Sequence, residues 1–165
     1  MAPIVIEARV QFDIDLLTKD TFFGLTDIDP DTLSIQAALL SNDGANTLTY
    51  VATDLVGFYQ SAELSDTNDW HAVYTGGVTS AETDSRELDL DVDATTGEFQ
   101  ILRLEVDPKG TVRWLVDGVL EKTLAAAVTT SGNLGVVLGV ESKGSATETL
   151  AADYLMVKAG RDWTI

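Results

Sequence analysis

The sequence predicts an all-β protein built as a sandwich of two antiparallel sheets. Apolar and polar residues alternate with a period of two over many short segments, which is typical of strands with one buried face. Turn-forming residues separate these segments, and no segment carries the apolar stripe of a helix. The chain has 165 residues, of which 45% are hydrophobic, so we expect residues 1–165 to form a single domain with a sizeable core.

The longest alternating segment comes first. From Ile4 to Leu16 the even-numbered residues are apolar, whereas the odd-numbered residues from Glu7 to Asp15 are charged or polar. This pattern predicts a long strand with one face in the core and one in water. Shorter strands are predicted at residues 22–26, 46–53, 70–74, 86–93 and 100–107.

A meander of three strands follows. The turn Asp107-Pro108-Lys109-Gly110 combines a proline that presets φ with a glycine that accepts positive φ. Asp117-Gly118 is a two-residue hairpin signal between the predicted strands 112–116 and 119–124.

Two strands close the chain. The first is predicted at residues 134–140, where Gly135 and Gly139 leave room on one face for a bulky neighbour. The last, at residues 150–158, is apolar on both faces, so we expect it in the centre of a sheet.

The charge of the chain excludes some partners. Ten Lys and Arg stand against 27 Asp and Glu, giving a formal net charge of −17. Such a field repels nucleic acid and anionic lipid, and no stretch approaches the roughly 18 apolar residues of a membrane span, so we expect neither nucleic acid nor membrane as partner. There is no Cys, hence no disulfide and no thiolate nucleophile. The segment Met1–Glu7 has no basic region followed by a long apolar run, so we expect no export signal.

The meander and the two ends of the chain carry a resemblance. The segment Leu102-Arg103-Leu104-Glu105-Val106, followed by Gly110-Thr111-Val112-Arg113-Trp114-Leu115-Val116-Asp117-Gly118, resembles the "V-x-W-x-V-D-G" hairpin of the concanavalin A-like jelly roll. The closing Ala152-Asp153-Tyr154-Leu155-Met156-Val157 is similar to the last strand of that superfamily. The resemblance implies a jelly roll whose last strand lies beside the first, here Ile6–Phe12.

A narrower resemblance suggests a function. The opening Glu7-Ala8-Arg9-Val10-Gln11-Phe12 strand, with Phe22-Phe23-Gly24-Leu25-Thr26-Asp27, is similar to small jelly-roll proteins of tailed-phage structural modules. That likeness implies a non-enzymatic virion protein, located in the virion, that decorates or stabilises a capsid as a homo-oligomer. Its partners would be capsid or other virion proteins. The alternative is a carbohydrate-binding module or lectin-like domain, with calcium as a possible aid.

One acidic segment imitates a catalytic motif. In Glu87-Leu88-Asp89-Leu90-Asp91-Val92-Asp93 a strand would place four carboxylates on one face. Retaining glucanases of the resembling fold carry E-x-D-x-E or E-x-D-x-x-E, with two Glu as nucleophile and acid/base, about 5–5.5 Å apart. The second Glu would fall at Asp91 or Val92, so we expect a solvated acidic face and no catalytic residues.

Calcium is the second use that the acidic segments could have, because calcium takes six to eight oxygen ligands. The candidates are 87–93 and Asp27-Ile28-Asp29-Pro30-Asp31. Neither follows the EF-hand spacing, so we assign no metal ligands and expect these Asp residues to initiate turns and keep edges soluble.

The single His and the three Trp complete the candidates. His71 has no nucleophile motif and no other nitrogen or sulfur ligand with it, so it is expected to be structural. Trp114 alternates with Val112 and Val116 and is predicted to be core. Trp70 and Tyr74 share a strand face and are the best candidates for an exposed sugar-stacking platform. Trp163 is expected to anchor the tail either on its own domain or on a neighbouring molecule.

Overall fold

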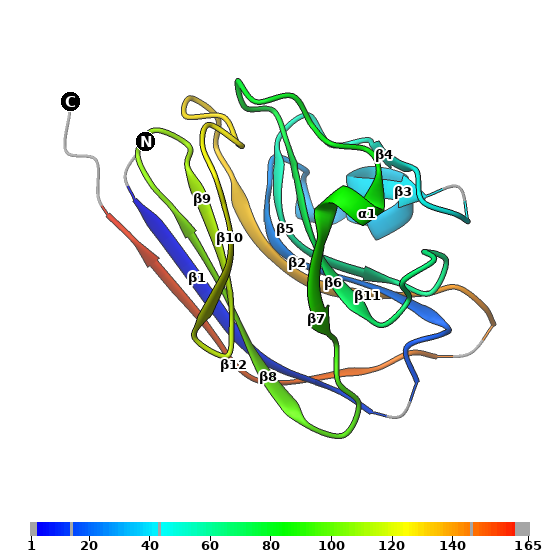
Figure 1. Ribbon diagram of the computed structural model, residues 1–165. Coiled ribbons are helices and arrows are strands. Elements are labelled where there is room, and N and C mark those ends of the chain that lie inside the picture. Colours follow the sequence, from blue (N-terminus) through cyan, green and yellow to red (C-terminus); the bar gives the residue numbers. More distant parts are fainter. Residues whose placement is uncertain (1–2, 14, 43, 146, 161–165) are drawn as a thin grey trace.

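The computed structural model describes residues 3–13, 15–42, 44–145 and 147–160. The protein is a jelly-roll sandwich of two five-stranded antiparallel sheets (Figure 1). Sheet A has the strand order β10-β9-β8-β1-β12 and sheet B the order β11-β2-β5-β6-β7. The strands of sheet A are β1 (Ile4–Phe12), β8 (Phe99–Val106), β9 (Val112–Val116), β10 (Val119–Leu124) and β12 (Leu150–Ala159). Those of sheet B are β2 (Lys19–Thr26), β5 (Leu55–Ser61), β6 (Asp69–Thr75), β7 (Asp89–Asp93) and β11 (Gly135–Ser142).

Smaller elements complete the fold. They are the 3-10 turn η1 (Pro30–Thr32), the π-turn η2 (Ile35–Leu39), the strand pair β3 (Leu40–Asn42) and β4 (Leu48–Tyr50), and the one-turn helix α1 (Ser85–Leu88). No helix in the described part of the chain is long and apolar enough to cross a membrane.

The period-two pattern of the first strand determines its burial. Along β1 the even-numbered residues from Ile6 to Phe12 are buried, and the odd-numbered residues between them are only partly so. The strand pairs with β8 on one side and with β12 on the other, so the first and last strands are neighbours, as the resemblance implied (Figure 1). Ile14 lies outside the described residues.

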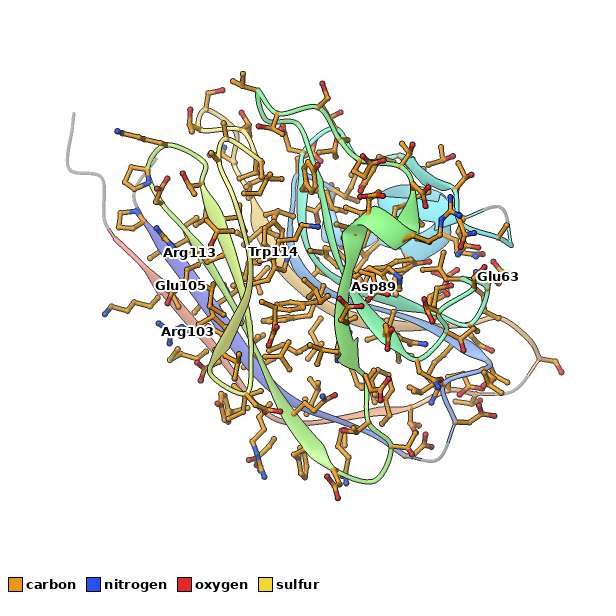
Figure 2. All side chains as sticks on the ribbon, in the orientation of Figure 1. Glu63, Asp89, Arg103, Glu105, Arg113 and Trp114 are labelled. Carbon is orange, nitrogen blue, oxygen red and sulfur yellow. The ribbon has the colours of Figure 1, made fainter. Side chains whose placement is uncertain are left out.

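The meander and its core tryptophan are confirmed. β8, β9 and β10 are consecutive antiparallel neighbours. Asp117 and Gly118 both have positive φ, as a type I′ hairpin turn requires. Trp114 is fully buried between the sheets, whereas Arg103 and Glu105 project outward from sheet A (Figure 2).

Sheet B has two buried faces. One packs on sheet A, and η2 with the β3–β4 pair lies against the other (Figure 1). Every residue of β2 and β5 is therefore buried, which hides the alternation that sequence reasoning uses. This is why residues 55–61 were not predicted as a strand. The strand predicted at 46–53 is shorter in the structure, where β4 spans Leu48–Tyr50 only.

A glycine pair allows β2 and β5 to approach each other under an aromatic ring. Gly24 lies opposite Gly57, and carbon atoms of the Phe22 ring occupy the space where their side chains would begin. Near Gly139 of β11, the bulky neighbour predicted from sequence is Ile35 of η2, whose Cδ1 would be 3.9 Å from an added Cβ.

The first strand was also predicted too long, because β1 ends at Phe12, and three further predictions are wrong. The segment 86–93 begins as a helix, because Asp84 caps α1 by accepting a hydrogen bond from the Arg86 backbone N–H, and only 89–93 is strand. Trp70 and Tyr74 are buried, since β6 is covered on both faces, and cannot form an exposed platform.

The third error concerns the last strand. β12 is an edge strand of sheet A, and its residues from Ala151 onward are exposed. Its apolar residues on both faces are thus not explained by burial within the described chain.

Candidate functional site

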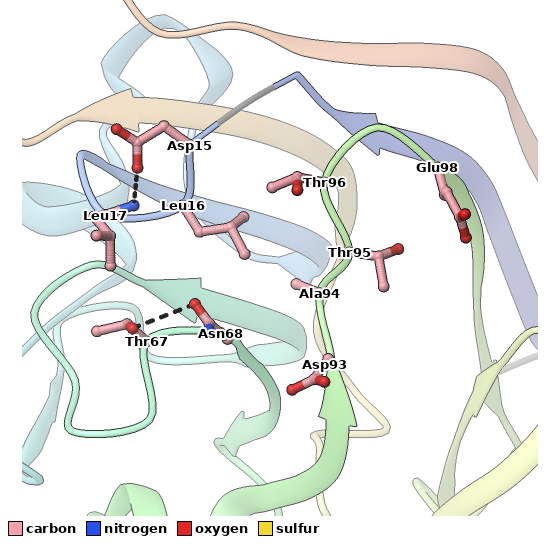
Figure 3. Close-up of a pocket in the computed structure, with 10 residues that line it drawn as sticks. All are labelled: Asp15, Leu16, Leu17, Thr67, Asn68, Asp93, Ala94, Thr95, Thr96 and Glu98. Carbon is pink, nitrogen blue, oxygen red and sulfur yellow. Dashed lines mark hydrogen bonds between the residues drawn. The ribbon is translucent and has the colours of Figure 1, made fainter.

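A cleft of about 630 Å³ opens at one end of the sandwich (Figure 3). Three segments form its walls: the loop after β1, the loop before β6, and the connection from β7 to β8. The lining residues combine carboxylates, hydroxyls, one amide and small apolar groups, namely Asp15, Leu16, Leu17, Thr67, Asn68, Asp93, Ala94, Thr95, Thr96 and Glu98. Its volume lies in the range of roughly 300–1,000 Å³ that is usual for small-molecule sites.

Two buried glutamines hold the walls in place. Gln60 of β5 donates from Nε2 to the backbone oxygens of Leu16 at 3.1 Å and Thr67 at 2.8 Å. Gln100 of β8 donates to the Asp93 backbone oxygen at 2.8 Å, and its Oε1 accepts from the Thr95 N–H at 3.0 Å. Because strands anchor these loops, the cleft is preformed and does not need to be ordered by a ligand.

The charged side chains that line the cleft are all negative. Asp15, Asp93 and Glu98 supply carboxylates, and none of the ten lining residues is basic. The Leu17 backbone N–H donates to Asp15 at 2.7 Å and orients that carboxylate (Figure 3). Carboxylates accept hydrogen bonds from hydroxyl or ammonium groups and repel anions.

Among the described residues, none of those that line the cleft is aromatic. The Trp70 ring lies beneath its wall, fully buried, with Nε1 donating to Gln100 at 3.2 Å. The aromatic groove expected of a lectin is therefore absent from this end of the described chain, and recognition here rests on polar contacts.

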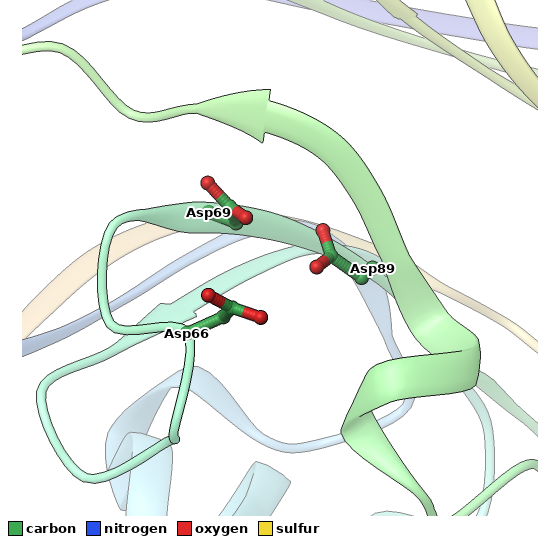
Figure 4. A group of neighbouring side chains, drawn as sticks. All are labelled: Asp66, Asp69 and Asp89. Carbon is green, nitrogen blue, oxygen red and sulfur yellow. The ribbon is translucent and has the colours of Figure 1, made fainter.

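Three aspartates gather beside the cleft. Asp66 precedes β6, Asp69 begins β6 and Asp89 begins β7, and each offers a carboxylate oxygen within 4.8 Å of the others (Figure 4). Burial first, then a hydrogen bond shared with Asp93 and the charges of Asp89 and Asp66, raise the pKa of Asp69 to about 7. Three carboxylate oxygens could supply part of a calcium shell of six to eight oxygens.

Sequence reasoning found only part of this cluster. It singled out Asp89 of the cluster, and Asp93 of the cleft, but placed both with Glu87 and Asp91 on one strand face. In the structure Glu87 is an exposed residue of α1, and Asp91 is exposed with φ of 53°. Asp66 and Asp69 were missed, although their i, i+3 spacing just before a strand was a usable signal.

The second acidic segment forms a turn, as predicted. Asp29 accepts a hydrogen bond from the Asp31 backbone N–H at 3.0 Å, and Asp27 accepts one from the Asp54 backbone N–H at 3.2 Å. Within the described ranges, this segment is not among the carboxylate groups close enough to share a cation.

His71 has a structural role. Its side chain is 1% exposed, and its Nδ1 lies 3.1 Å from the Asp69 backbone oxygen, so Nδ1 carries the proton and donates. Burial lowers the pKa of His71 and favours the neutral ring. Tyr59, its cross-strand neighbour, is also buried, so neither side chain can reach a substrate. Trp163 lies outside the described residues.

The raised pKa of Asp69 predicts how stability depends on pH. The folded chain holds this proton up to about pH 7, whereas the unfolded chain releases it near its ordinary value of 3.8. The stabilisation is complete below about pH 4 and is lost as the pH rises to about 7. We therefore expect Asp69→Asn to raise the free energy of unfolding at neutral pH by about 1–2 kcal/mol, discounted for partial exposure, and to leave it nearly unchanged at about pH 4.

Urea unfolding of the two proteins across this pH range measures the effect. Asp91→Asn is the matched control, because it removes an exposed charge from the adjoining strand and Asn tolerates the left-handed conformation. An equal gain in both variants at neutral pH would show that general charge repulsion, and not the Asp69 environment, is responsible.

Comparison with known proteins places the fold. No protein-family model and no curated protein sequence matches the chain. Among solved structures, the β-glucanase of Bacillus licheniformis is 14% identical with a TM-score of 0.57, over 98% of this chain and 68% of that one. The endo-β-1,3-glucanase of Pyrococcus furiosus is 13% identical with a TM-score of 0.56, over 97% and 64%.

Two further structural neighbours are a carbohydrate binding module and a lyase in complex with a trisaccharide. The carbohydrate binding module CBM66 from Bacillus subtilis is 9% identical with a TM-score of 0.50, over 96% of this chain and 76% of that one. The alginate lyase Aly36B, solved with an alginate trisaccharide, is 10% identical with a TM-score of 0.56, over 97% and 71%. At these identities the likeness is one of fold, and the shared fold is the two-sheet jelly-roll sandwich.

Proposed function

We propose that this protein binds carbohydrate without cleaving it, and that the end cleft is the binding site. The observation that carries the proposal is the lining of the cleft, where carboxylates, hydroxyls and an amide converge on a preformed hollow. Sugars present rings of hydroxyl groups that such side chains recognise by hydrogen bonds. The fold neighbours support this class of ligand, because they include a carbohydrate binding module and a lyase holding an alginate trisaccharide.

Charge narrows the class of sugar. With a net charge of −17 and only acidic ionisable groups in the cleft, the protein repels uronate polymers such as alginate. Neutral glycans avoid this repulsion. Amino sugars carry positively charged ammonium groups, which the carboxylates of the cleft attract. We therefore expect neutral or amino-sugar oligosaccharides to bind and uronate oligosaccharides to be rejected.

Capsid decoration, the first prediction from sequence, has no support among the matched structures and stays a prediction. So do the virion location and the use of calcium. The glycosidase alternative is weakened because Glu87 lies on the helix α1, whereas Asp89 and Asp93 lie on the strand β7, so the acidic residues do not form one strand face.

An array of neutral, amino and uronate oligosaccharides, followed by calorimetry on the best ligand, tests the proposal. The double variant Asn68→Ala with Asp93→Asn removes one amide and one negative charge from the cleft and is expected to weaken binding about tenfold or more. Glu105→Gln, on the outer face of sheet A, is the matched control and should bind like the unchanged protein. Calcium and a chelator are added in separate arms.

Three outcomes would overturn the proposal. One is the absence of binding to any neutral or amino sugar at millimolar concentration. Another is binding that survives the cleft variant but is lost in Glu105→Gln, which would place the site on sheet A. The third is cleavage of the ligand that disappears in Asp69→Asn, which would make the protein an enzyme.

A further inference from the structure

The outer edge of β12 carries a run of apolar side chains that the fold leaves uncovered. β12 ends sheet A, and within the described residues no strand pairs with its free edge. Four consecutive apolar side chains are exposed there: Tyr154 by 37%, Leu155 by 49%, Met156 by 38% and Val157 by 52%. A long apolar edge strand is a template for pairing with another chain.

One hydrogen bond shows which backbone groups are free. The Gly160 N–H donates to the Pro3 oxygen at 3.0 Å, so these two residues form a hydrogen-bonded pair. Such pairs alternate along an antiparallel ladder, and the next ones join β1 to Lys158, Met156 and Tyr154. The backbone N–H and C=O groups of Leu155, Val157 and Ala159 therefore point away from β1, toward the open edge.

The side chains of Leu155 and Val157 form an apolar strip on the face of sheet A that is turned toward sheet B. Leu155 and Val157 lie opposite Ala8 and Ile6 of β1, both of which are fully buried. They are on the core face of sheet A, but beyond the part that sheet B covers. Covering them requires an added strand or surface on the same side.

Charge favours a second copy over other partners. The chain as a whole has a net charge of −17, yet β12 contains one acid and one base. Asp153 is already paired with Arg9 at 2.7 Å. This edge is thus a neutral apolar strip on a strongly acidic molecule, where two copies can meet with the least repulsion.

The register of such a pairing follows from the free groups. Two copies of β12 aligned antiparallel about Met156 place Leu155 of one opposite Val157 of the other, both with outward backbone groups. Tyr154 then lies opposite Lys158 of the second copy, and these side chains can make a cation–π contact. Shifting the two-fold axis to Leu155 would place Asp153 opposite Val157 of the second copy, and the contact between Tyr154 and Lys158 would be lost.

We propose that the protein forms a two-fold symmetric dimer in which the two β12 strands pair antiparallel, joining both A sheets into one continuous sheet. The pairing is isologous, so it closes at two copies. It is independent of the carbohydrate proposal, because β12 contributes no lining residue to the end cleft. Salt is expected to strengthen the dimer, since screening weakens the repulsion between two acidic subunits.

Sedimentation velocity on the full chain, over a range of protein and salt concentrations, tests the dimer. The expected result is twice the chain mass of 17.7 kDa, with tighter association at higher salt. Val157→Pro removes an outward N–H that bonds to nothing in β1, so the monomer should keep its ladder while the dimer is lost. Val157→Thr keeps the N–H and the branched shape and should keep the dimer.

Leu155→Lys provides a second route to the same answer, because it adds repelling charges at the pairing edge without changing the backbone. Circular dichroism and thermal melts confirm that each variant is folded. A wild-type chain that is monomeric at every concentration would overturn the proposal. So would a dimer that survives both Val157→Pro and Leu155→Lys, or assemblies that grow beyond two copies.

Discussion

Replacing Trp114 with alanine is expected to lower the free energy of unfolding by about 3–5 kcal/mol. The side chain is fully buried between the sheets, and its ring packs edge-on against Tyr74 at 6.5 Å between centroids. Its Nε1 donates to the Gly57 backbone oxygen at 2.9 Å, which ties sheet A to sheet B. Alanine would leave a large cavity and a buried carbonyl without its partner, and both effects are destabilising.

Urea unfolding followed by circular dichroism measures this change. Trp114→Phe separates the two effects, because it keeps much of the volume but loses the hydrogen bond, and it should cost about 1–3 kcal/mol. Leu115→Ala is the control, since the neighbouring side chain points to the outer face and is only partly buried. If Trp114→Ala cost no more than Leu115→Ala, the hairpin would not be part of the core.

Replacing Gly24 with alanine is expected to lower the free energy of unfolding by about 3 kcal/mol, because the new methyl group has no space. Its Cβ would lie 2.6 Å from the Gly57 Cα and 2.7 Å from the Phe22 Cζ, and would also meet the Val56 backbone oxygen. Relief requires β2 and β5 to separate, which weakens the central ladder of sheet B.

Thermal melts should show this loss as a fall in Tm of about 6–12 °C for a chain of this length. The matched control is Gly139→Ala in the adjacent strand β11, where an added Cβ would be 3.9 Å from its nearest neighbours. That variant should stay within about 1 °C or gain slightly, since alanine lowers the entropy of the unfolded chain. A similar fall in both variants would contradict the close approach at Gly24.

The elements that sequence reasoning recovered are those with one buried face. In β1, β8 and β9 every second residue is buried, and the alternation of apolar and polar residues records this directly. The turns at Gly110 and Gly118 were found because positive φ leaves a local signature. β5 was missed, because a strand buried on both faces has no alternation to detect.

The candidate site was harder to foresee for a different reason. The cleft and the aspartate cluster are assembled from loops far apart in the chain, such as the one at Asp15 and the one before Glu98. Gln60 and Gln100 hold these loops together, yet nothing in the local sequence marks either residue as a brace. The raised pKa of Asp69 likewise depends on side chains brought near it by strand pairing.

By itself the sequence determined the fold class, the buried Trp114 hairpin and the absence of a complete glucanase motif. These follow from local periodicity, turn chemistry and residue identity, which do not depend on distant contacts. Only the tertiary structure decided that Trp70 and Tyr74 are buried, that Asp66, Asp69 and Asp89 meet, and that β12 lies at an exposed edge. Those features depend on how the sheets and loops pack against one another, and this packing involves residues that are far apart in the sequence.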